Sequence, residues 1–157
     1  MNLEILFSLL GPGYLLAVAW PLSKIDLRER RLPNALVLPA IPITLAGQII
    51  AASLSNEWWR LGLALVAAAI AFAVGLVVNR GAGMGMGDVK LIAAMTLALA
   101  WFSPFSPLIA LFIAFAAASM VVLVLYFARK TKLGSSIALG PYLLVGFAAS
   151  LATLPFG

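Results

Sequence analysis

Charged residues divide this chain into long stretches that contain no charge at all. Residues 5–23, 32–56 and 61–79 are the first three of these stretches. The hydrocarbon core of a bilayer is about 30 Å thick, and a helix needs roughly 20 apolar residues to cross it. Each of the three stretches therefore predicts one membrane-spanning helix.

The second half of the chain continues the pattern. Residues 91–128 are uncharged, and this run is long enough for two helices. Prolines in WFSPFSP, residues 101–107, disfavour helix in the residues before them and separate the two. A last apolar run follows the basic RKTK segment and occupies residues 133–157. The pattern predicts an all-α, polytopic membrane protein with six transmembrane helices, folded as a single domain over residues 1–157.

Composition supports a membrane protein. Of the 157 residues, 64% are hydrophobic and 10% are charged, and the mean hydropathy is +1.14. Such a chain is too apolar for an ordinary soluble domain. The formal net charge of +5 comes from lysines and arginines in short groups between apolar runs. This distribution indicates contact with anionic lipids and not with nucleic acid.

The positions of the basic residues predict the orientation in the membrane. On the six-helix prediction, Arg60 is the only one of the ten basic residues on its side. Because cytoplasmic loops are rich in lysine and arginine, both termini should face away from the cytoplasm. No basic residue precedes the first apolar run, so we expect that run to be a retained helix and not a cleaved signal peptide. The other nine are Lys24, Arg28, Arg30, Arg31, Arg80, Lys90, Arg129, Lys130 and Lys132.

The chain has two aspartates, and this topology brings them to the same membrane face. Asp26 ends the first predicted helix and Asp88 begins the fourth, both on the cytoplasmic side. Asp88 follows GAGMGMG, residues 81–87, in which Gly85 and Gly87 would let a substrate backbone approach the carboxylate. Asp26 could also be an ion-paired interfacial acid, and the glycines a linker or a place of close helix packing. The combination of the two acids and the glycine run favours an active site.

The available side chains restrict the chemistry. The chain has no histidine and no cysteine, which excludes a Ser-His-Asp triad, a cysteine nucleophile and the usual zinc sites. We expect neither a metal nor a cofactor. Peptide hydrolysis would then depend on water activated by carboxylates, with two neighbouring acids sharing one proton. Which of Asp26 and Asp88 holds the proton is left open.

Three segments resemble the type IV prepilin peptidase family. GMGD, residues 85–88, has the G-x-G-D form of membrane aspartyl proteases, and GMGDVKLIAA resembles the family's second-aspartate motif. DLRERRLPN, residues 26–34, is similar to its first-aspartate segment, and LGPYLLVG, residues 139–146, to its late Gly-Pro motif. The resemblance implies that Asp26 and Asp88 are catalytic. It also implies a prepilin substrate, with a basic leader and a hydrophobic helix, cleaved at the cytoplasmic face of the bacterial inner membrane.

The chain also departs from longer members of that family. These carry an N-terminal cytoplasmic region with paired cysteines, associated with N-methylation, which this sequence lacks. It therefore resembles the short, peptidase-only form of the tight-adherence (Flp) pilus type. Lys90 could favour ionisation of the acids or simply extend to the interface, and Glu29 could contact a basic residue of the leader. A proton-coupled transporter and a non-catalytic pilus-assembly scaffold are the alternative functions.

Overall fold

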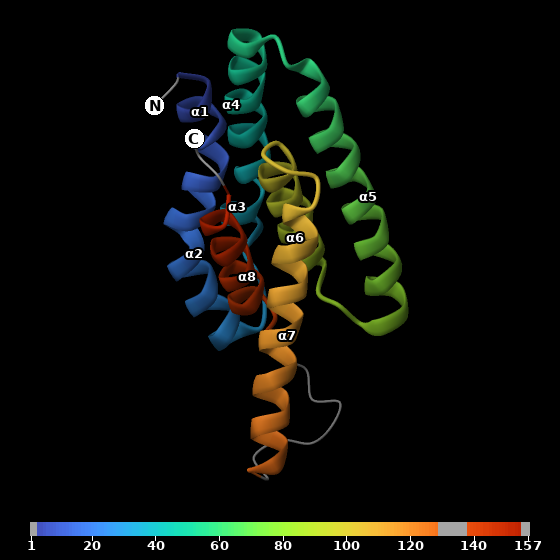
Figure 1. Cartoon of the computed structure of the whole chain (residues 1–157). Coiled ribbons are helices and arrows are strands. Elements are labelled where there is room, and N and C mark those ends of the chain that lie inside the picture. Colours follow the sequence, from blue (N-terminus) through green and yellow to red (C-terminus); the bar gives the residue numbers. More distant parts are fainter. Residues whose placement is uncertain (1–2, 129–137, 155–157) are drawn as a thin grey trace.

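The computed structural model describes residues 3–128 and 138–154, which form eight helices and no strand (Figure 1). The all-α prediction is confirmed. The helices are α1 (Leu3–Ser8), α2 (Leu10–Glu29), α3 (Asn34–Val37), α4 (Ala40–Ser55), α5 (Trp58–Ala82), α6 (Met86–Ala100), α7 (Ser106–Phe127) and α8 (Gly140–Ala152).

Two pairs of these helices are single membrane passes with a break near a proline. α1 and α2 form one segment from Leu3 to Glu29, and α3 and α4 another from Asn34 to Ser55. A proline ring inside a helix collides with the carbonyl group four residues earlier. Pro12 and Pro42 each lie four residues after such a break, at Ser8 and Leu38. The eight helices therefore make six passes.

Four of the six passes are long and apolar enough to cross a bilayer: Leu3–Glu29, Asn34–Ser55, Trp58–Gly81 and Ser106–Phe127. The protein is thus a polytopic integral membrane protein by the length and composition of its helices. The other two passes are shorter, with 15 residues in α6 and 13 in α8. Six complete transmembrane spans therefore stay a prediction.

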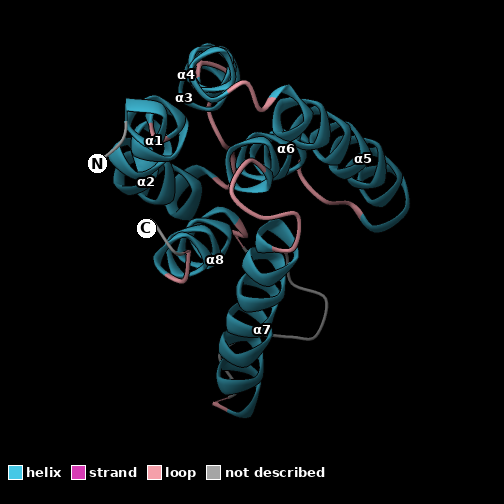
Figure 2. Ribbon diagram, turned by 45° about the horizontal axis from the view of Figure 1, so that its top comes forward, coloured by secondary structure: helices cyan, strands magenta, loops and turns pink. Residues whose placement is uncertain are grey.

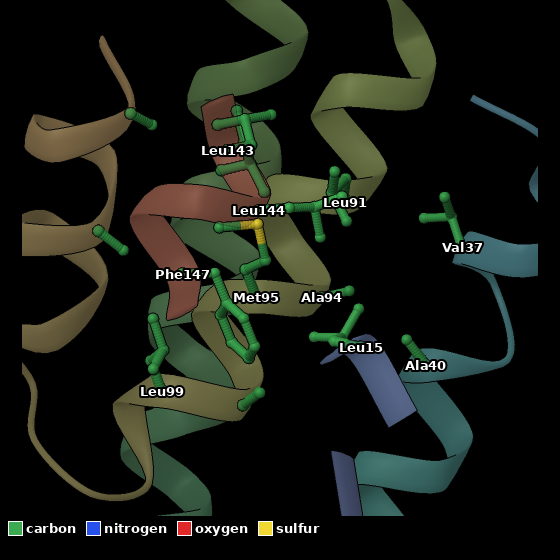
Figure 3. Packing of buried hydrophobic residues seen from close by; sticks show 14 of the residues in the cluster. Leu15, Val37, Ala40, Leu91, Ala94, Met95, Leu99, Leu143, Leu144 and Phe147 are labelled. Atoms are coloured by element: carbon green, nitrogen blue, oxygen red, sulfur yellow. The ribbon is translucent and has the colours of Figure 1, made fainter. Parts of the chain in front are cut away.

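Helix α6 lies at the centre of the bundle (Figure 2). Every residue from 91 to 100 is buried. Leu91, Met95 and Leu99 of α6 belong to the main core together with Leu15 of α2 and Phe147 of α8 (Figure 3). Because side chains pack against α6 from several helices, its first turn has a defined position relative to α2 and α8.

Small residues and one buried amide hold the bundle together away from the acids. A Cβ atom on Gly146 of α8 would lie 2.2 Å from the carbonyl oxygen of Ala110 in α7, so these two helices approach as closely as backbones allow. Gln48 of α4 donates from Nε2 to the carbonyl oxygen of Leu97 in α6 at 2.7 Å. These contacts join α8 to α7 and α4 to α6 through direct packing and a hydrogen bond.

The observed helix limits differ from the predicted ones in three places. The first pass continues past residue 23 to Glu29, three residues beyond Asp26, which was predicted to end it. α6 begins at Met86, within the glycine run. The last helix covers 140–152 where 133–157 was predicted, although residues 129–137 and 155–157, which include the basic residues Arg129, Lys130 and Lys132, lie outside the described part of the chain.

Candidate active site

Asp26 lies on the last turn of α2 and is only 4% exposed. The helix ends one turn later at Arg30, which adopts the left-handed conformation with φ 51°. The backbone N–H of Arg30 donates to the carbonyl oxygen of Asp26 at 2.8 Å. The turn that carries the acid is therefore fully hydrogen-bonded, and the charged residues that follow it are exposed at the helix end.

The Asp26 carboxylate is bound by a distant element of the fold. The backbone N–H of Gly140, the first residue of α8, donates to Asp26 Oδ2 at 2.9 Å. Amide groups in the first turn of a helix have no partner within it, and the positive end of the helix dipole favours a negative charge there. A Cβ atom on residue 140 would lie 2.7 Å from the same carboxylate oxygen. Glycine is therefore the residue that permits this contact.

The second acid, Asp88, lies in the first turn of α6. The loop before it starts at Gly83, whose φ of +70° suits glycine and ends α5. The side-chain amide of Asn79 in α5 donates to the carbonyl oxygen of Met84. Gly85 then takes the extended N-cap position, and Val89 N–H donates to its carbonyl at 3.2 Å. The glycine run therefore forms a turn between α5 and α6, and these hydrogen bonds fix its conformation.

The two oxygens of Asp88 have different surroundings. Oδ2 lies beside Gly85, where a Cβ atom would approach it to 2.9 Å. Oδ1 is buried and accepts no hydrogen bond from the part of the chain that the structure describes. Most buried polar atoms in native proteins have a partner, so an exception calls for a functional explanation. Asp88 therefore presents one oxygen that the surrounding protein groups do not use.

The position of Leu32 shows that the two acids lie close together in the fold. A Cβ atom on Gly87 would come within 2.8 Å of the Leu32 Cβ, and one on Gly140 within 3.1 Å of the Leu32 Cδ2. Leu32 thus lies between the residue before Asp88 and the residue that binds Asp26. Asp26 is near enough for an electrostatic interaction with the Asp88 carboxyl group. Asp26, Asp88, Gly85 and Gly87 therefore lie close together in the fold.

The other two predicted residues lie at the edge of this group. Lys90 is half-buried, and its Nζ donates to the side-chain oxygen of Asn34, at the start of α3, at 3.0 Å. This bond connects α6 to the segment that follows Asp26. Glu29 is exposed on the last turn of α2. Their effects on the acids and on the substrate stay predictions.

Sequence reasoning did not select three residues that shape this site. Gly140 belongs to LGPYLLVG, and Leu32 and Asn34 belong to DLRERRLPN, so all three lie in segments that carry the family resemblance. The sequence signal for these three residues was that each lies within a segment that resembles a motif of the family. No local feature indicated that a backbone amide 114 positions away would bind Asp26.

These observations first define a class. The protein is a helical integral membrane protein in which two acids from different helices meet at one end of the bundle. The sequence model of the type IV leader peptidase family matches residues 13–127. The chain belongs to this family, and membership implies a protease of the aspartic type that acts on type IV prepilins. The matched part contains both aspartates and ends before α8. Comparison with curated proteins and with solved structures returned no match.

Proposed function

We propose that this protein is an aspartic endopeptidase with Asp26 and Asp88 as its catalytic pair. It removes the basic leader from Flp-type prepilins at the cytoplasmic face of the bacterial inner membrane. The proposal rests above all on the meeting of the chain's two aspartates, one bound by Gly140 and the other held by the glycine turn. Family membership and the resemblance to the short, peptidase-only form support it.

The geometry supports a mechanism in which the two carboxyl groups share one proton. The ionised acid takes a proton from water, and the resulting hydroxide attacks the scissile carbonyl carbon. The protonated acid gives its proton to the carbonyl oxygen, which forms a neutral tetrahedral intermediate. As the C–N bond breaks, the acid that took the proton from water gives it to the leaving amine, and the other acid takes a proton from a hydroxyl group of the intermediate, so the pair again holds a single proton. Asp88 Oδ1, which has no protein donor, is the oxygen we assign to the water or the carbonyl group.

The charge distribution supports the proposed orientation. The acids lie at the same end of the bundle as Arg28, Arg30 and Arg31, whereas Glu57 and Arg60 pair at the start of α5, at 2.9 Å, at the opposite end (Figure 1). Lysine and arginine favour the cytoplasmic side. The exposed carboxylate of Glu29 is then the acid on that face that a leader lysine or arginine would meet. Anionic lipids surround the same basic face.

The test is cleavage of a synthetic Flp-type prepilin by the purified protein in detergent. Asp26→Asn and Asp88→Asn should each abolish cleavage, because asparagine keeps the shape of aspartate but cannot exchange a proton with water. The double variant should be no worse than either single one, since the two acids act as a unit. Glu57→Gln, an acid removed at the far end of the bundle, is the matched control and should cleave like the parent.

The alternatives make different predictions for the same variants. A transporter would lose proton-coupled flux and would show no prepilin cleavage to lose, and a scaffold would tolerate every one of these changes. Protein level and detergent-extracted monodispersity show whether each variant has folded. If either asparagine variant keeps more than a few per cent of the parent rate, the mechanism with a carboxylate pair is wrong.

A further inference from the structure

An apolar groove of about 450 Å³ runs along α6 between α5 and α7. Both neighbours pack on α6 (Figure 2). Residues of α6 form the floor of the groove. We refer to it as the α5–α7 groove. The residues that matter below are Ile70 and Val74 on the α5 wall, Ile92 and Thr96 on the floor, and Leu108 and Phe115 on the α7 wall.

The α5–α7 groove opens where a bilayer would surround the protein. Its walls belong to two of the four passes that are apolar enough to cross a membrane. Val74 is 57% exposed on one wall and Leu108 is 63% exposed on the other. Thr96 is the only polar side chain among the lining residues and is 5% exposed. The groove therefore suits an apolar partner that can also use one hydroxyl group.

The groove leads to the candidate active site. Its lining includes Met84, the residue before Gly85 in the glycine turn. On the floor, Ile92 and Thr96 follow Asp88 at steps of four residues, which places all three along one side of α6. At the other end the lining reaches Pro104 in the connection between α6 and α7. A molecule that lies along the groove would therefore have one end beside the glycine turn that precedes Asp88.

The direction and length of the groove fit a helix in the membrane. On α5 the lining runs from Ala67 to Val78, which is about 16 Å along the helix axis. The long axis of the groove is therefore that of the membrane passes themselves. Apolar helices bind grooves by inserting side chains from one face, three and four residues apart. Membrane helices associate through such packing and through hydrogen bonds between helices, for which Thr96 offers a hydroxyl.

We propose that the α5–α7 groove binds the hydrophobic helix of the prepilin substrate and so presents the start of that helix to the two aspartates. This inference rests on the proposed function, because it takes the substrate to be a prepilin with a hydrophobic helix after its leader. A lipid chain and a second copy of this protein are the other apolar occupants of a membrane groove. Neither would require the groove to end at the glycine turn.

Cross-linking tests the location directly, because the chain has no cysteine of its own. Val74→Cys and Phe115→Cys place thiols on the two walls. Val77→Cys and Phe112→Cys are the controls, since these residues are 70% and 75% exposed on the same two helices but do not line the groove. Each is combined with Asp88→Asn, which keeps the substrate whole. The probe is a Flp-type prepilin with one cysteine in its hydrophobic helix, two turns after the cleavage site.

With a short bis-maleimide, we expect the two wall variants to cross-link to the prepilin at least fivefold more than their controls. Equal yields at wall and control positions would overturn the inference, as would cross-links found only between copies of the enzyme. Protection of the wall cysteines by lipid alone, with no prepilin cross-link, would assign the groove to lipid and would also overturn it.

A second measurement asks whether the groove is used during cleavage. Val74→Trp fills the groove, and Val77→Trp adds the same bulk outside it. Two substrates are compared: the whole prepilin and a short peptide that contains the leader and the cleavage site without the helix. The ratio of the two kcat/KM values, prepilin over peptide, should fall at least tenfold in Val74→Trp relative to Val77→Trp. An equal ratio in both variants would reject the inference.

The two proposals fail in different ways. A parent protein that cleaves neither substrate would overturn the proposed function, on which this inference depends. A parent that cleaves both in an aspartate-dependent manner, with equal behaviour of wall and control variants, would leave the proposed function intact and remove the groove from it.

Discussion

The two aspartates are held in contrasting ways. Asp26 is buried at the end of a long helix, and its carboxylate accepts a hydrogen bond from α8, far away in the sequence. Asp88 stands at the start of α6 behind a local glycine turn, and one of its oxygens has no donor among the described residues. One acid is positioned by the tertiary fold and the other by its own loop. We infer that Asp26 is the fixed member of the pair and that Asp88 offers the free oxygen to the reactants.

Apart from replacement of the aspartates themselves, the largest effect is expected at the tertiary contact. In Gly140→Ala the new methyl group would lie 2.7 Å from Asp26 Oδ2 and 3.1 Å from the Leu32 Cδ2, so the carboxylate must move. A displacement of about 1 Å in a catalytic group can reduce the rate about a hundredfold. We expect a loss of this size in kcat for prepilin cleavage. Gly13→Ala is the control, because no atom lies within 4 Å of that added Cβ. A Gly140→Ala enzyme that keeps the parent kcat would show that the α8 contact does not position Asp26.

A smaller effect is expected at the local turn. In Gly85→Ala the methyl group meets only the Asp88 carboxylate, at 2.9 Å from Oδ2. The end of a side chain can rotate away from such a contact, so the thermal stability should stay within about 2 °C of the parent. The rate should still fall, by about tenfold, because the carboxylate is no longer in place. Gly81→Ala, with no atom within 4 Å, should change neither value. A large loss of stability would mean that Gly85 serves the fold and not the acid.

A third measurement separates the two possible roles of Lys90. Its bond to Asn34 should contribute about 1 kcal/mol to stability, so Lys90→Met and Asn34→Ala should destabilise the protein equally and without additivity. If the charge of Lys90 also acts on the acids, only Lys90→Met should move the pH dependence of kcat, since Asn34 carries no charge. We expect the two pH profiles to coincide. A shift confined to Lys90→Met would establish an electrostatic role.

The smallest effect is expected at Glu29. This residue is exposed, and exposed ion pairs typically contribute about 0.2–1 kcal/mol. Glu29→Gln should therefore raise KM for the prepilin about twofold at low salt and leave kcat unchanged. The difference should vanish for a prepilin whose leader lysines and arginines are replaced by glutamine. An unchanged KM at low salt would remove Glu29 from substrate recognition.

The hydrophobic pattern was enough to predict the helical passes, because apolar runs between charged groups report where helices cross a membrane. The pattern did not predict correctly where these helices end. The first helix was predicted to end at Asp26, but it continues to Glu29 because charges at a membrane surface are compatible with helical structure. The fourth helix was predicted to begin at Asp88, and α6 begins two residues earlier, at Met86 within the glycine run.

The sequence predicted those parts of the site whose function depends on the type of side chain. Two aspartates and a glycine run are visible in a sequence, and they lie together in the structure. The Gly140 amide belongs to the backbone, which every residue possesses, so its role depends on the packing of α2 against α8. Gly87 illustrates the same limit. Its predicted role in admitting a substrate stays a prediction, and the sequence did not show that a Cβ atom at this position would collide with Leu32.

The length of α6 has a consequence for the shape of the substrate. Its 15 residues extend about 22 Å, roughly 8 Å less than the hydrocarbon core. The end of α6 away from Asp88 is sealed by Gln48 and by the buried Trp101, so we infer that the shortfall lies on the Asp88 side. An extended chain covers about 3.3–3.6 Å per residue. An extended segment of about two or three residues on the leader side of the scissile bond would therefore span this distance from the membrane surface.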